Sequence, residues 1–198
     1  DISNLQKATH LFIKNSTGAS LLLKQKELER FVIELSWKSS KIEGNTYTLL
    51  DTERLIKEGI EAKGHDKEEA IMILNHKKAF QYVITNSEQY RNISIHSIED
   101  IHRLLIEELG VSFGIRSRQV GVTGSKYLPL SIPSQIKESL EDLCKTISKL
   151  KSPYSKAFIA LLGISYIQPF EDGNKRTARL VANAILIALN CAPLSYRN

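Results

Sequence analysis

Residues 168–179, near the end of the chain, place a carboxylate beside a turn glycine, followed by three cations. They are Asp172, Gly173, Lys175, Arg176 and Arg179. The apolar residues that follow recur at helical spacing, so we expect a buried helix that begins near Asn174. Cations in the first turns of a helix oppose its macrodipole, each by about 0.3–1 kcal/mol, so a negative ligand should compensate them. Free backbone N–H groups at the helix start, with two arginines on one face, therefore predict a site for an anion that carries several phosphates.

Asp172 lies beside the predicted anion site, where it can hold a divalent metal against the phosphates. The run Gly-Asn-Lys-Arg at 173–176 also has a simpler interpretation. It is a glycine turn followed by a basic helix end that pairs with surface acids. These four residues alone do not decide between the two.

Taken as a whole, residues 168–179 resemble the signature of the Fic family, His-x-Phe-x-Asp/Glu-Gly-Asn-Gly/Lys-Arg-x-x-Arg, and match it at every specified position except the first. The resemblance implies an all-α fold, a single Fic-type helical domain with a short β-hairpin flap. It also implies a protein adenylyltransferase, which binds ATP with Mg²⁺ and transfers AMP to a hydroxyl side chain of a target protein. Pyrophosphate is then released.

The resemblance assigns a role to each matching residue. Phe170 would anchor the loop in the core, and Asp172 would hold magnesium between the first two phosphates of ATP. The anion cradle would consist of Gly173, Asn174 and Lys175. Arg176 would contact the β phosphate and Arg179 the γ phosphate, in agreement with the charge pattern of the residues themselves.

The departure from the family pattern is Gln168, which stands where the family has a histidine that takes the proton from the attacking hydroxyl. A carboxamide cannot accept this proton near neutral pH. General-base catalysis contributes about 100-fold to 10,000-fold, so nucleotide binding should survive while turnover nearly vanishes. A natural and an engineered origin of this inactive or crippled variant both stay open. The chain has five histidines, none in a recognisable base context, and we expect surface or helix positions for them: His10, His65, His76, His96 and His102.

A second signal lies in residues 26–45, where apolar residues follow the i, i+3, i+4, i+7 pattern of an amphipathic helix that stops at Gly44-Asn45. Glu43 is then a negative charge at the negative end of a helix, which is unfavourable. The arginines at the start of the last helix are also at the unfavourable end of a helix dipole. The two unfavourable charges would compensate each other if Glu43 paired with Arg179. A solvated charge at the helix end is the alternative.

The segment from Ser39 to Gly44 resembles the inhibitory motif of the Fic family, Ser/Thr-x-x-x-Glu-Gly/Asn. In that motif the glutamate holds the second arginine of the signature, so that ATP binds in a non-productive pose. The resemblance therefore implies autoinhibition by Glu43. An inhibitory helix ahead of the core is the class II arrangement of the family, which needs no separate antitoxin.

Residues 114–129 are expected to form a short hairpin, because Val120 and Val122 alternate ahead of a Gly124-Ser125 turn. The segment resembles the Fic flap, which docks the target by adding the target's extended backbone as a strand. The resemblance assigns target binding to Val120, Val122, Thr123 and Gly124. A two-stranded connection without a binding role is the alternative.

Helical periodicity predicts three further helices, at residues 66–87, 134–150 and 154–167. Ser97 and Asp100 resemble a capping box ahead of another helix. The last predicted helix leads directly into the signature loop, so the order helix, loop, helix provides the setting that the signature requires.

One domain accounts for the whole chain, because we find no internal repeat, low-complexity tract or flexible linker in its 198 residues. We divide the domain into an N-terminal lead-in, the inhibitory helix with its motif, and the Fic core: residues 1–25, 26–45 and 46–198. The core includes the flap and the signature loop and helix, residues 168–190.

The net charge of +5 reflects 27 basic and 22 acidic residues spread along the chain, which does not indicate nucleic-acid binding. No apolar run approaches a membrane span and no secretory signal is visible, so we expect a cytoplasmic protein without a membrane partner. Cys144 and Cys191 lie in different apolar helices and are expected to be buried thiols. The expected partner is a protein with a Ser, Thr or Tyr hydroxyl, docked on the flap, and a homo-oligomer stays open.

Two other functions stay open beside AMP transfer. One is a nucleotide-binding pseudoenzyme, which the substitution at Gln168 favours. The other is a protein kinase similar to the related Doc toxins, which bind ATP the other way round and also have lysine at the position of Lys175. Doc-like motifs usually have alanine where Gly173 stands, and this favours AMP transfer.

Overall fold

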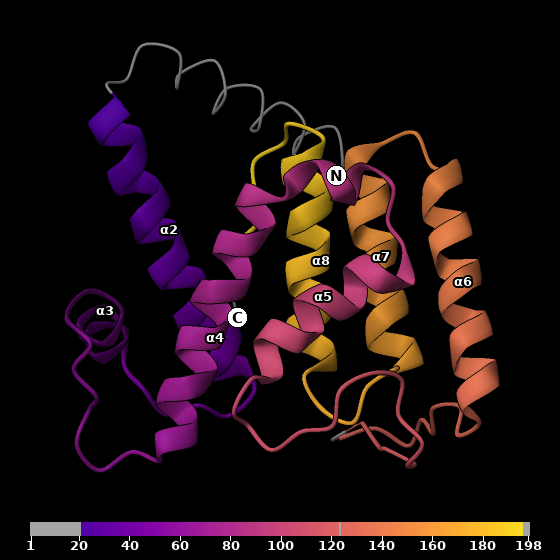
Figure 1. The fold of residues 1–198 in the computed structure, drawn as a ribbon, viewed down its shortest axis with the longest axis horizontal. Helices are drawn as coiled ribbons and strands as arrows, with labels where there is room; N and C mark the ends of the chain where they lie inside the picture. Colours follow the sequence, from indigo (N-terminus) through magenta and orange to yellow (C-terminus); the bar gives the residue numbers. More distant parts are fainter. Residues whose placement is uncertain (1–20, 123, 196–198) are drawn as a thin grey trace.

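The computed structural model describes residues 21–122 and 124–195. Every regular element within these ranges is helical (Figure 1), which confirms the all-α prediction. In chain order the elements are α2 (Leu21–Ile42), α3 (Leu49–Glu58), α4 (Lys67–Thr85), the 3₁₀ helix η2 (Ser87–Arg91), α5 (Ile95–Ile106), α6 (Pro133–Lys149), α7 (Pro153–Ile167) and α8 (Asn174–Ala188). None of the described helices is long and apolar enough to cross a membrane.

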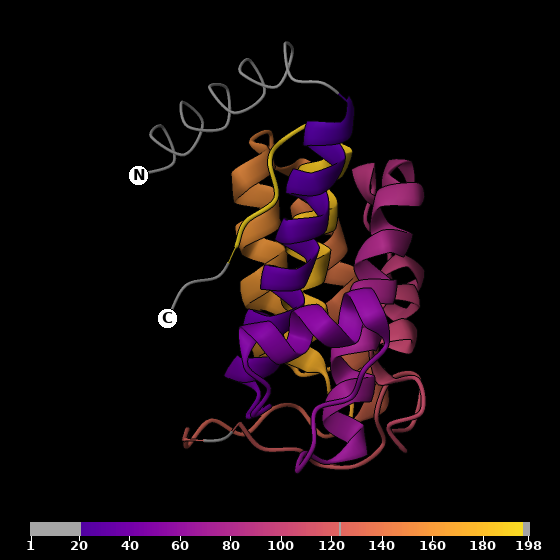
Figure 2. The ribbon, with the colours of Figure 1, turned by 90° about the vertical axis from the view of Figure 1, so that its left-hand side faces the viewer.

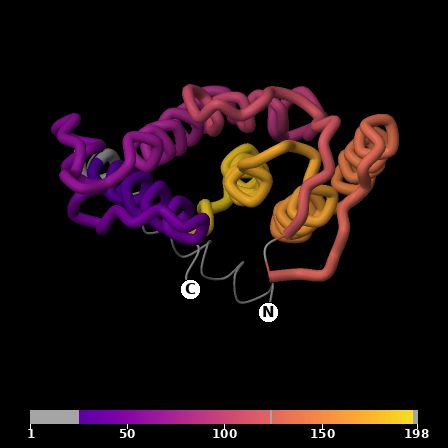
Figure 3. The backbone as a smooth tube through the Cα atoms, turned by 90° about the horizontal axis from the view of Figure 1, so that it is seen from below, coloured from indigo at the N-terminus to yellow at the C-terminus, as the bar shows by residue number. Residues whose placement is uncertain are grey.

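Helix α8 is the centre of the fold, and the other helices surround it (Figure 3). It contacts α7, α5, α4, η2 and α2, while α6 packs on the outer side of α7. Figure 2 shows α2 lying along α8, with α3 crossing the lower end of α2. All residues of α8 except Lys175 and Ile187 are buried, and after the first turn its sequence is apolar apart from Arg179 and Asn183.

Three of the predicted helices agree with the structure to within two residues. The ranges 66–87, 134–150 and 154–167 correspond to α4, α6 and α7. Helix α2 ends as expected but begins at Leu21, inside the segment that we assigned to a lead-in, and residues 1–20 lie outside the described part of the chain. Helix α3 was not predicted, and its short length of 10 residues leaves little room for a periodic pattern.

The predicted capping box of Ser97 with Asp100 is wrong. Helix α5 begins one turn earlier, where Ser94 has extended backbone angles and its hydroxyl accepts from the N–H of Ser97 at 3.2 Å. The Ser97 hydroxyl in turn accepts from the N–H of Ser94 at 3.0 Å. A serine at the third helical position thus takes the part that Glu or Gln has in the usual capping box.

The predicted β-hairpin flap is not present as a hairpin: the described residues of 114–129 contain no strand, and Thr123 lies outside them. The turn itself forms, since the N–H of Ser125 donates to the carbonyl of Val122 at 3.0 Å. An isolated two-stranded ribbon is at best marginally stable, so a ladder needs further support. Here the side chain of Arg116 bonds the carbonyls of Arg118 and Leu130 at the base of the loop instead.

Candidate functional site

The signature residues form a tight loop between α7 and α8, and left-handed backbone conformations mark both ends of the loop. Gln168 closes α7 with φ 50° and ψ 58°. Gly173 precedes α8 with φ 75°, and a Cβ at this position would lie 3.4 Å from Cγ2 of Ile106. Glycine is therefore favoured at 173 by the backbone conformation and also by the close neighbour.

Asn174 closes the loop with two reciprocal hydrogen bonds to Phe170. Its Nδ2 donates to the carbonyl of Phe170 at 2.8 Å, and its Oδ1 accepts from the N–H of Phe170 at 2.9 Å. The side chain that we assigned to the anion cradle therefore holds the loop together. The backbone N–H groups at the start of α8 remain as the groups that could bind an anion there.

Phe170 is fully buried, as its anchoring role requires, and it stacks on His102 of α5. The two ring centroids are 3.7 Å apart and the rings are nearly parallel. Burial lowers the pKa of His102 to about 4, so the ring is neutral at pH 7. Its Nε2 donates to the carbonyl of Asp172 at 3.0 Å, because a carbonyl can only accept. His102 therefore holds the signature loop by ring stacking on Phe170 and by a hydrogen bond to the backbone of Asp172.

Sequence reasoning missed this role of His102. The position of His102 in the sequence could have indicated its burial. It lies within an i, i+3, i+4, i+7 pattern of one buried helix face, which consists of Ile98, Ile101, His102 and Leu105. A histidine within such a stripe needs a buried polar partner, and here the partner is the backbone of the signature loop.

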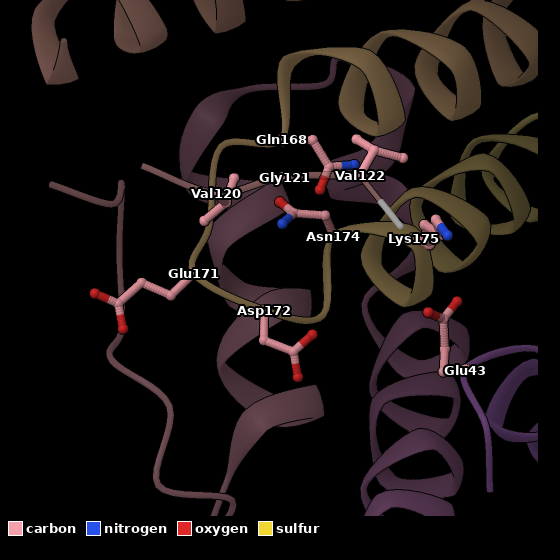
Figure 4. A pocket seen from close by; sticks show the side chains of 9 residues that line it. All are labelled: Glu43, Val120, Gly121, Val122, Gln168, Glu171, Asp172, Asn174 and Lys175. Carbon is pink, nitrogen blue, oxygen red and sulfur yellow. The ribbon is translucent and has the colours of Figure 1, made fainter. Parts of the chain in front are cut away.

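The signature loop borders an open pocket with a volume of about 120 Å³ (Figure 4). Its lining comes from the end of α2, the loop after α5, the signature loop and the first turn of α8: Glu43, Val120, Gly121, Val122, Gln168, Glu171, Asp172, Asn174 and Lys175. This volume is smaller than that of a typical ligand pocket, so a nucleotide would extend beyond it into the open space outside. Of the predicted flap residues, Val120 and Val122 line the pocket, whereas Gly124 does not.

Gln168 faces this pocket and is almost fully buried. Its Nε2 donates to the carbonyl of Ser165 at 2.6 Å, which fixes the orientation of the carboxamide. The structure therefore places residue 168 where a base could meet a ligand in the pocket, with a side chain that cannot take a proton at neutral pH.

Arg176 lies behind the pocket wall and is 2% exposed. Its guanidinium donates to Oδ2 of Asp172 at 3.0 Å and to the carbonyl of Leu105 at 3.4 Å. Burial lowers the pKa of Arg176, and the nearby Asp172 opposes this shift, so the guanidinium remains charged. The side chain of Asp172 is 63% exposed and reaches the pocket.

Arg179 pairs with Glu43 across the contact between α8 and α2, as the two mismatched helix ends had suggested. One Nη of Arg179 lies 2.7 Å from Oε1 of Glu43 and 2.9 Å from the carbonyl of Ser39. The Nε donates to the hydroxyl of Ser39 at 3.0 Å. Glu43 is thus a paired, partly buried carboxylate, and the alternative of a solvated charge is wrong.

Gly44 ends this segment in a left-handed conformation, with φ 96°. Its N–H donates to the carbonyl of Lys41 at 3.0 Å, which closes the last turn of α2. The chain then leaves the helix directly after Glu43, so that the glutamate lies at the rim of the pocket.

His76 of α4 lies behind the same contact and is completely buried. Burial, together with the smaller effect of the positive charges of Arg179 and Arg176, lowers its pKa to about 3. Its Nδ1 is 3.4 Å from the hydroxyl of Ser36 on α2. Neutral histidine and serine side chains therefore surround the paired arginine.

Asp172 is the candidate metal ligand. Within the described residues, no three or more His, Cys, Asp and Glu side chains are grouped in a way that could hold a metal ion. One exposed carboxylate beside a pocket fits Mg²⁺, since this ion is commonly held by one or two carboxylates together with substrate phosphates and water.

The comparison with known proteins agrees with this geometry. The model of the Fic/DOC family matches residues 92–186, which include α5, the loop after it and the whole signature. The chain belongs to the Fic/DOC family.

Relatives of this chain carry names that describe an activity. It is 28% identical over 186 residues to Protein adenylyltransferase Fic of Nematostella vectensis, which covers 92% of this chain and 44% of that protein. It is 30% identical over 161 residues to Protein adenylyltransferase fic-1 of Caenorhabditis briggsae, covering 77% of this chain and 31% of that protein. The chain thus spans less than half the length of these relatives.

Solved structures show the same fold. Fic-1 (aa134–508) from C. elegans superposes with a TM-score of 0.81 at 22% identity, over 98% of this chain and 59% of that chain. A Fic domain containing signaling protein from Bacteroides thetaiotaomicron VPI-5482 gives a TM-score of 0.79 at 20% identity, over 92% of this chain and 72% of that chain. The helical arrangement of this chain is therefore that of a Fic domain.

Proposed function

We propose that this chain is a Fic-type protein adenylyltransferase scaffold that binds ATP with Mg²⁺ in the pocket of the signature loop. The observation that supports the proposal is the location of Asp172, Lys175 and the start of α8 on one pocket. A helix start and a lysine attract phosphates, and a carboxylate beside them suits the accompanying cation. The relatives named as protein adenylyltransferases point to the same class of reaction.

The reaction transfers AMP to a hydroxyl of a target protein. The hydroxyl oxygen forms a bond to the α phosphorus, the bond from that phosphorus to the bridging oxygen breaks, and pyrophosphate leaves. The proton of the hydroxyl must pass to a base, which Gln168 cannot be. We therefore expect transfer slower by about 100-fold to 10,000-fold than in a variant with histidine at position 168.

Glu43 is the proposed inhibitor. Neither Arg176 nor Arg179 lines the pocket, and each is bonded to a carboxylate. For Arg179 to reach a γ phosphate, its guanidinium must exchange Glu43 for the phosphate. The glutamate thus competes with the nucleotide for the arginine, and its removal should strengthen ATP binding.

The test is the double variant with Gln168→His and Glu43→Gly, incubated with ATP labelled on the α or on the γ phosphate. We expect label on protein from α-labelled ATP only. The matched controls are the two single variants, of which Glu43→Gly alone should bind ATP and transfer almost nothing. Label arriving only from the γ phosphate would indicate a Doc-like kinase and would overturn the proposal.

A second candidate is a nucleotide-binding protein without transfer activity, which the fixed carboxamide of Gln168 favours. Tight ATP binding by the double variant, with no label transferred from either position, would select this candidate. The expected partner in both cases is a protein whose hydroxyl-bearing segment docks on the loop that contains Val120 and Val122.

A further inference from the structure

Arg116 joins the signature loop to both ends of the loop that borders the pocket, and it does so through backbone carbonyls. Its Nε donates to the carbonyl of Gln168 at 2.6 Å. One Nη donates to the carbonyl of Arg118 at 2.9 Å and the other to that of Leu130 at 2.5 Å. Its backbone N–H donates to the carbonyl of Pro169 at 3.0 Å. One residue thus bonds two consecutive carbonyls of the signature loop and closes residues 118–130 at their base.

The environment of Arg116 is unusual for an arginine. The residue is 2% exposed, and no carboxylate of the described chain bonds it. Burying a charge is costly unless hydrogen bonds compensate it, and in the described chain the guanidinium donates its hydrogen bonds to backbone carbonyls. Lysine has the same charge but lacks the planar fork that reaches three carbonyls in different directions. The site therefore requires the shape of arginine and not only its charge.

The bond to Gln168 bears on the geometry of the pocket. The left-handed conformation is unfavourable for a residue other than glycine, so the surroundings of Gln168 must hold it there. The two bonds from Arg116 fix the carbonyls of Gln168 and Pro169, and thereby the direction in which side chain 168 leaves the backbone. Val120 and Val122, in the loop that the same guanidinium closes, line the pocket together with this side chain (Figure 4).

We infer that Arg116 is a positioning residue, which fixes side chain 168 and the loop segment 120–122 relative to one another. A target hydroxyl held on this loop would then meet residue 168 at a set distance. This inference rests on the proposed function. Arg116 makes no hydrogen bond to Asp172, Lys175, Arg176 or Arg179, so it acts on the geometry of transfer and leaves nucleotide affinity unchanged.

The activity test uses the Gln168→His, Glu43→Gly protein as its background. Adding Arg116→Lys should lower kcat for transfer of α label by about 100-fold, the size of effect that misplacing reacting groups by 1 Å can produce. The Kd for ATP should stay within about twofold, because only an interaction made in the transition state is lost. The matched control is Arg91→Lys, an exposed arginine on η2 paired with Glu88, which should change neither value. Unchanged transfer, or transfer and ATP affinity falling together, would overturn the inference.

A second measurement does not depend on activity. In the otherwise unchanged chain, NMR signals of the Val120 and Val122 methyl groups and of the Gln168 carboxamide should shift or broaden with Arg116→Lys, while the methyl signals of Ile185 in the core should not. Unchanged signals would overturn the inference whether or not the background transfers AMP. If the background fails to transfer but these signals change, the proposed function fails and the positioning role of Arg116 stands.

Folding of the variants is checked by circular dichroism and thermal unfolding. Arg116→Gln is the second variant, because it removes the buried charge while keeping one amide donor for a carbonyl. It should fold and give the same loss of transfer at unchanged ATP affinity. Failure of both variants to fold would mean that Arg116 has a purely structural role, and the inference would be wrong.

Discussion

The two sides of α8 are held by different physical chemistry. Toward α7, the core consists of buried apolar residues from both helices, such as Ala160 and Ile164 on α7 and Val181 and Ile185 on α8. Toward the last turns of α2, the buried side chains are polar, and an arginine on α8 is held by a serine and a glutamate.

This difference separates a permanent contact from one that can be exchanged. Apolar surface has no better partner than the core, so the contact between α7 and α8 persists as long as the protein is folded. The hydrogen bond of Arg179 to the Glu43 carboxylate can be exchanged for one to a phosphate, because both acceptors are anions and both bonds are charge-assisted. The signature loop is thus built on the permanent side of α8, and its proposed inhibitor sits on the exchangeable side.

The largest expected effect lies on the apolar side. Ile185→Ala removes a side chain that is 1% exposed, and we expect a loss of about 2–5 kcal/mol in the free energy of unfolding, since the cavity cannot fully collapse. Urea denaturation measures it. The control is Leu162→Ala on α7, at a position 49% exposed, which should change stability by no more than about 0.5 kcal/mol. Similar losses in both variants would mean that the core is not where the structure places it.

On the polar side, removing the Glu43 carboxylate should lower the stability of the fold and raise the affinity for ATP. Glu43→Gly leaves Arg179 without its carboxylate partner, so we expect a loss of about 1–3 kcal/mol in the free energy of unfolding. ATP affinity, measured by calorimetry, should rise in the same variant. Glu53→Gly changes an exposed glutamate of α3 that pairs with Lys57, and it should leave ATP affinity as it was. Equal ATP affinity in the two variants would contradict the competition for Arg179.

The buried histidine on the polar side makes stability depend on pH. The pKa of His76 is lowered to about 3, below the ordinary value of 6.5, so the unfolded chain takes up the proton first as the pH falls. The stabilising effect of the neutral ring is therefore complete above pH 6.5 and is lost between 6.5 and about 3, by at most about 1.4 kcal/mol per pH unit.

His102 contributes in the same direction, because its pKa is lowered to about 4. Urea denaturation of the His76→Gln variant between pH 7 and 4 separates the contributions of the two histidines. This variant should keep only the pH dependence of the unfolding free energy that is due to His102. A slope equal to that of the unchanged chain would show that His76 is not buried as described.

The smallest effect distinguishes two neighbouring serines of α2. Ser39 bonds Arg179 with its hydroxyl, so Ser39→Ala should cost about 1–2 kcal/mol. The hydroxyl of Ser40 is buried without a hydrogen-bond partner among the described residues, so Ser40→Ala should be neutral or stabilise by about 1 kcal/mol. Thermal unfolding of the pair measures the difference, and a larger loss for Ser40→Ala would reverse the assignment.

Much of the helical framework could be predicted, because strong periodic patterns are local. Helices α4, α6, α7 and α8 were located from their apolar spacing, and the helix that ends at Gly44 was located from the pattern and the glycine together. The hairpin prediction failed because alternation at 120 and 122 records only a local preference. Whether the two segments form β-ladder hydrogen bonds depends on which other groups bond their backbone. Here the Arg116 side chain bonds the carbonyls of Arg118 and Leu130.

The sequence by itself determined the signature residues, the carboxamide at Gln168 and the unfavourable charge of Glu43 at a helix end, since residue types and their order along the chain suffice for these. Only the tertiary structure decided that Arg179 is held by Ser39 and Glu43, that His102 supports the loop, and that Arg116 joins two segments. The physical reason is that each of these contacts joins segments distant in the chain, and a buried polar group takes whichever partner the packing of the helices brings within hydrogen-bond distance.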